Sequence, residues 1–171
     1  MPPSIPGYAI EERVHGSRLR CIYRGTRLAD GADVVLKTLN AEYPTAEEVA
    51  ELRREFRIAQ LLADVPRIIR VHSVEEWGQG NIAICMEPFG VSLARILVDS
   101  DHEPLALERF FEVAIPLAST LGSVHQHGVV HKDVVPRNVL VDEVTGDIRL
   151  IDFGISSELD RERQTSVDLS R

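Results

Sequence analysis

Cysteine is scarce in this chain of 171 residues, which contains only Cys21 and Cys85. The two lie far apart and in no paired spacing, so the sequence indicates neither a disulfide framework nor a thiolate zinc site. The proline-rich residues 1–7 lack the basic start and apolar core of a signal peptide, and no later stretch approaches the length of a membrane span. We therefore expect a soluble segment that suits the reducing cytoplasm.

Basic residues are also fewer than acidic ones. The chain has 19 lysines and arginines and 27 aspartates and glutamates, which gives a net charge of −8. Such a surface repels nucleic-acid phosphates and anionic membranes, so we expect no nucleic-acid partner and no membrane contact for this segment. Any phosphate binding must come from a few local groups. A hydrophobic content of 44% is enough for one core or for two small lobes around a cleft.

The first half of the sequence has the pattern of a sheet with one helix. Strand patterns span residues 8–14, 20–27, 34–39, 68–75 and 82–87. Asp30-Gly31 is a hairpin turn signal between the second and third strands. After the third strand, Thr45 and Glu48 form a capping box, which predicts the start of a helix. One face of this helix is apolar, at Val49, Leu52, Phe56, Ala59 and Leu62.

The strand pattern ends at Pro88-Phe89-Gly90, and the chain beyond it turns helical. We predict helices at 92–97 and 107–127 and a small hairpin at 138–141 and 148–151. Gly128 follows the long helix as a left-handed C-cap, and Pro116 within that helix should remove one hydrogen bond and kink it. The predicted domains are a proline-rich lead at 1–7, a small lobe at 8–87 and a large lobe at 88–171.

Two motifs in the second half carry the chemistry. His131-Lys132-Asp133 is followed by Asn138, and fourteen residues later Asp152-Phe153-Gly154 ends a predicted strand. Here the sequence resembles the protein kinase family, whose catalytic-loop and metal-binding motifs occur in this order and at this spacing. The resemblance implies an α+β, two-lobed fold, with a five-stranded antiparallel small lobe, one main helix and a partial, mainly helical large lobe. The pattern is similar to the N-terminal kinase domains of large bacterial multidomain signalling proteins.

The resemblance implies ATP and Mg²⁺ as cofactors. Phosphoryl transfer needs a carboxylate at the incoming hydroxyl and hard oxygen ligands for Mg²⁺ on the nucleotide phosphates. Asp133 would serve the hydroxyl as the catalytic residue, while Asn138 and Asp152 would hold the metal. Each residue alone is typical of a turn cap or a strand end, but the ordered set favours the catalytic interpretation.

Val34-Val35-Leu36-Lys37 resembles the kinase strand whose lysine pairs with the ATP phosphates and with a glutamate of the following helix. An exposed strand lysine is the alternative interpretation of Lys37 alone. The following helix carries carboxylates beside its apolar face, and Glu55 lies where it can turn back toward the sheet. Glu48 already serves the capping box, and Glu51 is the second choice as partner.

The resemblance also implies which residues hold the nucleotide. Met86 would border the adenine, and Glu87 and Phe89 would offer backbone groups to the base. Lys37 and Ser17, the latter in the loop that covers the phosphates, complete the polar contacts. Apolar side chains above and below the base would come from Val14, Ile22, Val35, Leu140 and Ile151.

The sequence departs from the family in its phosphate-covering loop, in its catalytic loop and in its length. The phosphate-covering loop has a single glycine, Gly16, where the family has three. Val135 replaces the lysine that serine/threonine kinases carry two residues after the catalytic aspartate. Arg137 stands where tyrosine kinases carry an arginine, and it is either a catalytic phosphate clamp or a structural salt bridge. The chain stops at Arg171, inside the family's activation segment, so we expect a fragment of a larger protein.

The sequence thus predicts a protein kinase fragment, of serine/threonine type, that transfers the γ-phosphate of ATP to a protein hydroxyl. Its partners would be a protein substrate or downstream domains of the same parent chain. Two alternatives are a pseudokinase interaction module and a small-molecule phosphotransferase. A metal hydrolase would use residues near the motif, namely His125, His127, His131 and Asp133, but the first two project in different directions from a helix.

Overall fold

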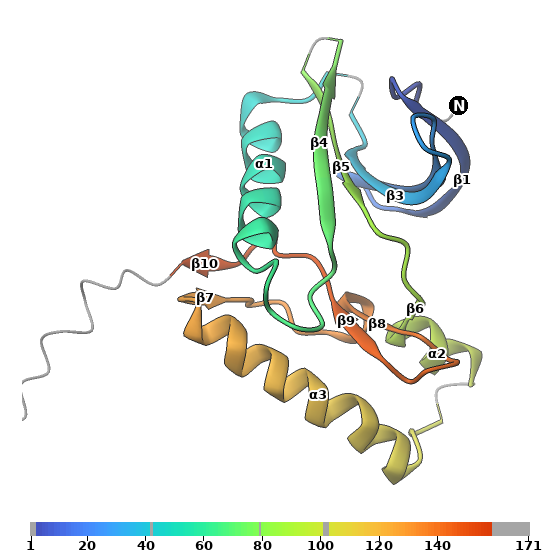
Figure 1. Cartoon of the computed structure of the whole chain (residues 1–171), viewed down its shortest axis with the longest axis vertical. Helices are drawn as coiled ribbons and strands as arrows, with labels where there is room; N and C mark the ends of the chain where they lie inside the picture. Colours follow the sequence, from blue (N-terminus) through green and yellow to red (C-terminus); the bar gives the residue numbers. More distant parts are fainter. Residues whose placement is uncertain (1–2, 42, 79, 101–102, 159–171) are drawn as a thin grey trace, which may run out of the picture. The chain divides into compact units, whose positions relative to one another are not determined.

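The computed structural model describes residues 3–158 except 42, 79 and 101–102 (Figure 1). The chain forms two compact units. Residues up to Ala63, together with Ile69–Gly90, make up the first unit. Asp64–Ile68 and the residues from Val91 onward make up the second.

The first unit contains a five-stranded antiparallel sheet with the strand order β1-β2-β3-β5-β4. The strands are β1 (Tyr8–Gly16), β2 (Arg20–Arg27), β3 (Ala32–Leu39), β4 (Val71–Trp77) and β5 (Asn81–Met86). This sheet confirms the predicted α+β class. The prediction was wrong at the start of β4, because Ile68 forms a parallel bridge with Leu150 instead of extending the sheet strand.

Helix α1 (Ala46–Leu61) begins at the predicted capping box and runs beside β4 and β5 (Figure 1). The backbone N–H of Glu48 donates to Thr45 Oγ1 at 3.2 Å, and the N–H of Thr45 donates to Glu48 Oε2 at 2.8 Å. Both bonds satisfy donors that a helix start would otherwise leave unpaired. Leu52 of α1 belongs to one buried apolar cluster with Leu39, Ile82 and Ile84 of the sheet.

A second apolar cluster lies among other side chains of the same sheet. Its buried members are Ile5, Cys21, Tyr23, Val34, Leu36, Ala83 and Cys85. Ile5 shows that the lead before β1 contributes to this core. Beside it, the Tyr8 hydroxyl on β1 donates to Glu75 Oε1 on β4 at 2.8 Å, which links the two edge strands of a curled sheet. Both cysteines are buried and free.

The second unit contains the predicted helices α2 (Leu93–Asp99) and α3 (Leu107–Gln126) and the 3₁₀ helix η1 (Pro136–Asn138). Its strands are β6 (Val91–Ser92), β7 (Val129–Val130), β8 (Val139–Val141), β9 (Ile148–Leu150) and β10 (Ser157–Glu158). The hairpin of β8 and β9 is the predicted one. Strands β6, β7 and β10 were not predicted, because two residues cannot show a period.

Helix α3 continues through Pro116 and ends before Gly128, whose φ of 74° is the left-handed conformation predicted for a C-cap. Val113, Thr120 and Val124 are its buried side chains. No helix in the described part of the chain has both the length and the apolarity that crossing a bilayer requires.

Candidate active site

Lys37 on β3 and Glu55 on α1 form a buried ion pair in the first unit. Lys37 Nζ lies 2.6 Å from Glu55 Oε1, and each residue is only 6% exposed. The sheet register fixes the lysine, because Lys37 pairs with Ile22 of β2 and with Ile84 of β5. Glu55 is the buried charged residue of α1, between Leu52 and the next buried turn of the helix.

The two other carboxylates considered for this pairing have different partners. Glu51 is exposed, and its Oε2 lies 3.4 Å from Arg20 Nη2. Glu48 is held by the capping box at Thr45. The structure therefore brings Lys37 together with Glu55 and not with Glu51.

The turn between β1 and β2 is closed by local hydrogen bonds instead of glycines. The Ser17 backbone N–H donates to Arg20 O at 2.8 Å, and Ser17 Oγ accepts from Arg20 N at 3.0 Å. Asn40 Nδ2 donates to Ser17 O at 2.8 Å and ties this turn to the residue after β3. The Ser17 hydroxyl thus has a local structural role, and its contact with a phosphate stays a prediction.

The segment after β5 is fixed by a reciprocal pair of hydrogen bonds. The Glu87 N–H donates to Arg70 O at 3.0 Å, and the Arg70 N–H donates to Glu87 Oε1 at 3.0 Å. Met86 pairs with Val35 across the sheet, and Phe89 is partly buried. Sequence reasoning missed Arg70, because its part in this arrangement uses only backbone groups, which leave no signal in the residue type.

The residues predicted to make apolar contacts with the nucleotide are divided between the two units. Ile22 and Val35 are partly buried on β2 and β3, while Val14 on β1 is 53% exposed. Leu140 on β8 and Ile151 after β9 are partly buried in the second unit. Ile22 lies across the ladder from Lys37, so the structure brings these two predicted site residues together.

Asp133 is held in the second unit by two side chains that follow it. Asn138 Nδ2 donates to the Asp133 backbone O at 2.9 Å and to Asp133 Oδ2 at 3.0 Å. Arg137 Nη2 donates to the same Oδ2 at 2.8 Å. The 3₁₀ turn of η1 brings these side chains back to the aspartate. Within the described chain no hydrogen bond reaches Asp133 Oδ1, so one carboxylate oxygen is fixed and the other is available as an acceptor.

His131 is the buried support of this loop. Its Nε2 lies 3.0 Å from Ile151 O, and the Asp133 N–H donates to its Nδ1 at 3.2 Å. This pattern assigns the neutral tautomer with the proton on Nε2. Burial of the ring lowers its pKa below the ordinary 6.5. The ring contacts Phe153 edge-on, with centroids 4.7 Å apart.

Asp152 directly follows Ile151, whose N–H donates to Asn138 O at 3.0 Å, next to the ladder of β8 and β9. Asp152 has a φ of 68°, a conformation that costs energy for a residue other than glycine. Its Oδ1 accepts from the Gly154 N–H at 3.3 Å. Arg67 and Lys132 adopt the same left-handed conformation, with φ of 64° and 67°.

Asn138 and Asp152 have the oxygen chemistry that Mg²⁺ prefers. The Asn138 amide nitrogen is used by Asp133, so its Oδ1 is the atom left to accept or to ligate. The described residues contain no cluster of three or more His, Cys, Asp or Glu side chains that could hold a metal. Two protein oxygen ligands would suit an ion that takes its remaining ligands from phosphate and water.

The histidines of the hydrolase alternative are engaged elsewhere. His125 and His127 are exposed at the end of α3, and His127 Nδ1 lies 2.8 Å from Ser123 O. Both nitrogens of His131 take part in the loop contacts given above. These three side chains do not form a ligand set.

Comparisons with known proteins agree with this arrangement. A family model described as "Protein kinase domain" matches residues 16–170. Serine/threonine-protein kinase PrkC of Bacillus subtilis is 26% identical over 153 residues, 89% of this chain and 23% of that protein. CBL-interacting protein kinase 25 of Oryza sativa is 31% identical over 154 residues, 84% of this chain and 28% of that protein. The chain thus spans about a quarter of the length of these relatives.

Proposed function

Because the chain belongs to the protein kinase family, we propose that it is the ATP- and Mg²⁺-binding part of a serine/threonine-type protein kinase. The buried Lys37–Glu55 ion pair is the observation that carries the proposal. Burying two charges is costly, and apolar side chains of similar volume would usually stabilise a core as well or better. A buried lysine held in place by a carboxylate is suited to bind the phosphates of a nucleotide.

Asp133 is the proposed catalytic base for a protein hydroxyl. Its Oδ2 is fixed by Asn138 and Arg137, which leaves Oδ1 to orient the hydroxyl and accept its proton. Asn138 and Asp152 would hold Mg²⁺, which when bound offsets the charge of the phosphates. The neutral His131 holds the loop through its contacts with Ile151 O and the Asp133 N–H, and it does not exchange a proton in this scheme.

Arg137 is proposed to supply the positive charge that Val135 lacks. Its side chain is 66% exposed, and Nη2 binds Asp133, so the other donors of the guanidinium can contact the transferred phosphate. Arg137 therefore combines the two alternatives left open by the sequence, a salt bridge and a phosphate clamp. The expected partners are a protein substrate or other domains of the same protein, and the expected location is the cytoplasm.

Thermal unfolding with Mg-ATP tests the nucleotide site. A ligand that binds only the folded chain at 100 times its Kd adds about 2.7 kcal/mol to stability, so the melting temperature should rise with Mg-ATP concentration. Lys37→Met should remove most of the rise, and the exposed Arg24→Met should keep it. A folded chain that shows no rise at millimolar Mg-ATP would contradict the proposal.

A pseudokinase is the second candidate, and the β1–β2 turn favours it. Ser17 closes that turn with its own side chain, where glycines would allow close approach to the phosphates. Nucleotide binding without phosphate transfer would support this candidate. Transfer to a small alcohol alone would support the phosphotransferase alternative.

A further inference from the structure

Arg20 is the first residue of β2 and follows the turn in which the family carries its glycines. Residues 15–20 match the glycine motif, and Arg20 stands where the motif ends in glycine. The side chain is 20% exposed, and its Nη2 lies 3.4 Å from Glu51 Oε2 on α1. The other terminal nitrogen, Nη1, is buried and has no hydrogen-bond partner in the described part of the chain. A buried donor without a partner costs free energy, so this position of the guanidinium is unfavourable.

The ion pair between Arg20 and Glu51 is weakly held. Its contact distance of 3.4 Å is longer than the 2.6 Å of the buried Lys37–Glu55 pair, and the Glu51 side chain is 57% exposed. Ion pairs that reach solvent contribute little to stability. Among the described residues, Glu51 is the one carboxylate within ion-pair distance of Arg20. A more highly charged anion can therefore displace Glu51, and the move would give Nη1 an acceptor.

Three backbone donors of the β1–β2 turn are already in use. The Ser17 N–H donates to Arg20 O at 2.8 Å, and the N–H groups of Leu19 and Arg20 donate to Ser17 Oγ at 3.3 and 3.0 Å. Loops that bind phosphate usually offer it such backbone N–H groups. A phosphate near this turn therefore needs a side-chain donor, and a guanidinium can contact two phosphate oxygens at once.

The register of the sheet aligns Arg20 with the proposed nucleotide contacts of β3. Val35, Lys37 and Leu39 alternate with residues of the other face, so their side chains lie on one face of the sheet. In the proposed binding mode, Val35 contacts the base and Lys37 the phosphates. Leu39 is the next position in that direction, about 7 Å further along the strand. Arg20 pairs with Leu39 in the ladder, so it shares this face and lies beyond Lys37, on the side of the terminal phosphate.

We propose that Arg20 binds the terminal phosphate of ATP and leaves Glu51 when the nucleotide enters. The inference rests on the proposed function, because it needs a nucleotide whose phosphates reach Lys37. The buried Lys37–Glu55 pair stays closed, whereas the Arg20–Glu51 pair opens and frees one positive charge for the phosphate. The side chain of Arg20 thus replaces the close backbone approach that a glycine would allow.

Isothermal titration calorimetry of the 171-residue chain with Mg-ATP and with Mg-ADP tests the inference. Arg20→Met should weaken ATP binding about tenfold, the effect of losing one charge-assisted contact, and change ADP binding by less than about twofold. Arg20→Lys keeps the charge but not the two-donor geometry, so it should weaken ATP binding by a smaller factor. Arg18→Met, at an exposed position of the same turn, is the matched control and should leave both affinities unchanged.

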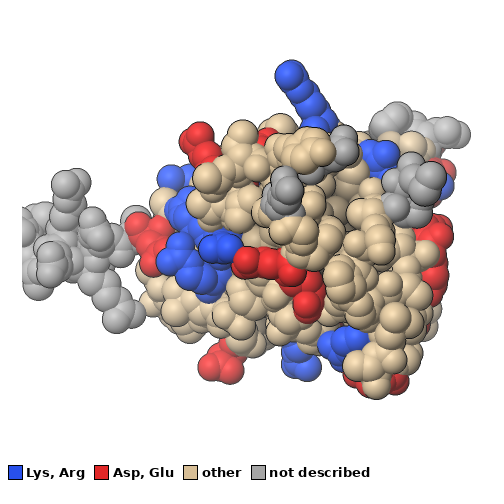
Figure 2. All heavy atoms as spheres, turned by 90° about the horizontal axis from the view of Figure 1, so that it is seen from above, with Lys and Arg blue, Asp and Glu red and all other residues tan. Residues whose placement is uncertain are grey.

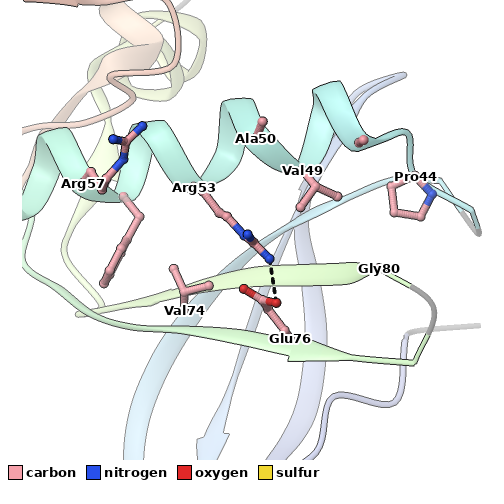
Figure 3. Close-up of a pocket in the computed structure, with 10 residues that line it drawn as sticks. Pro44, Val49, Ala50, Arg53, Arg57, Val74, Glu76 and Gly80 are labelled. Atoms are coloured by element: carbon pink, nitrogen blue, oxygen red, sulfur yellow. Dashed lines mark hydrogen bonds and ion pairs between the residues drawn. The ribbon is translucent and has the colours of Figure 1, made fainter.

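Glu51 provides a test of opposite sign. Glu51→Gln should strengthen ATP binding about threefold, because Arg20 no longer has to leave a carboxylate. In a chain that also carries Arg20→Met, the Glu51 change should have no effect. Glu76→Gln is the control, since it breaks the exposed pair of Arg53 and Glu76 that joins α1 to β4 at 2.7 Å (Figure 3). This control should leave ATP binding unchanged.

Different results would overturn this inference and the proposed function. Equal weakening of ATP and ADP binding by Arg20→Met would overturn the contact with the terminal phosphate. Weaker ATP binding in Glu51→Gln would also contradict the inference, because the pair would then position α1 instead of restraining Arg20. If Arg20→Met binds Mg-ATP as well as the original chain does, only this inference fails. If the original chain binds no Mg-ATP at millimolar concentration, the proposed function fails with it. Circular dichroism establishes that each variant is folded.

Discussion

At the scale of single residues, the Lys37–Glu55 pair illustrates how the stability cost of losing one charge differs between buried and exposed ion pairs. Its 2.6 Å contact is as short as several exposed pairs, but its two side chains are buried. Removing one partner leaves the other charge in the core, which typically costs about 3–5 kcal/mol. The same change in the exposed Arg53–Glu76 pair costs about 1 kcal/mol or less.

We therefore predict that Lys37→Met and Glu55→Gln each lower the free energy of unfolding by roughly 3 kcal/mol. The double variant should lose less than the sum, because both single changes remove the same contact. Urea denaturation measures this, with Arg53→Met and Glu76→Gln as the matched controls. The same four variants should show non-additive effects on Mg-ATP affinity only for the buried pair. Additive effects would mean that Lys37 and Glu55 do not act together.

His131 predicts a dependence of stability on pH. Burial holds the pKa of the folded ring below 6.5, so the unfolded chain takes up this proton first as the pH falls. The contribution of His131 is present above about pH 6.5 and is lost as the pH falls toward the folded pKa. The slope approaches about 1.4 kcal/mol per pH unit at most.

Urea denaturation between pH 8 and 5 tests this, by comparing slopes rather than absolute stabilities. His131→Gln should flatten the acid side of the profile, whereas His125→Gln, at an exposed position, should leave it unchanged. An unchanged slope in the His131 variant would show that the imidazole is not held neutral by the fold.

At the scale of elements, two glycines have opposite expected responses to alanine. A Cβ atom on Gly25 of β2 would lie 2.3 Å from the Ala9 carbonyl oxygen of β1, so the backbone must shift. A Cβ atom on Gly122, inside α3, would meet nothing within 4 Å. The first position requires glycine for close strand pairing, and the second does not.

Gly25→Ala should destabilise the chain by about 1–3 kcal/mol through overpacking. Gly122→Ala should stabilise the chain by about 0.5–1 kcal/mol. Alanine has less conformational freedom than glycine in the unfolded chain, and it leaves less of the helix backbone exposed in the folded chain. Differential scanning calorimetry of both variants measures the shifts in melting temperature. A neutral Gly25→Ala would show that β1 and β2 can separate at little cost.

Sequence patterns predicted the elements that carry a period or a cap. The capping box at Thr45 located the start of α1, and Gly128 located the end of α3. Patterns failed where a contact between residues distant in sequence sets the boundary of a strand. Ile68 was predicted to begin the fourth strand, but it bridges Leu150, and β4 starts at Val71. Neither bridge partner carries any local mark of this pairing.

At the scale of the whole molecule, charge is distributed in a way that net charge alone does not reveal. On the face shown in Figure 2, the described acidic and basic side chains are interspersed and separated by uncharged areas. This mixture suits local anion binding by a few arginines in a chain of net charge −8.

The sequence predicted the motif residues of the candidate site but not how they are held. Motif spacing singled out Asp133, Asn138 and Asp152, and the structure brings the first two into contact. The part of Arg70 in its two bonds with Glu87 had no signal, because Arg70 contributes only backbone groups, which do not depend on its residue type. The assignment of catalytic roles to these residues stays a prediction.

Two variants can distinguish the phosphate-transfer step from metal binding. The assay uses a protein that contains these 171 residues together with the part that binds the protein substrate. Asp133 is proposed to act mainly in the transition state, whereas Asp152 is proposed to bind the metal already in the ground state. Asp133→Asn should therefore lower kcat by about 10²–10⁴-fold and keep the affinity for Mg-ATP, while Asp152→Asn should lower both. Transfer of label from ATP to protein measures kcat, with Asp133→Asn as the blank. If transfer does not exceed that blank while nucleotide still binds, the protein acts as a pseudokinase, because a bound nucleotide without a working base cannot phosphorylate a hydroxyl.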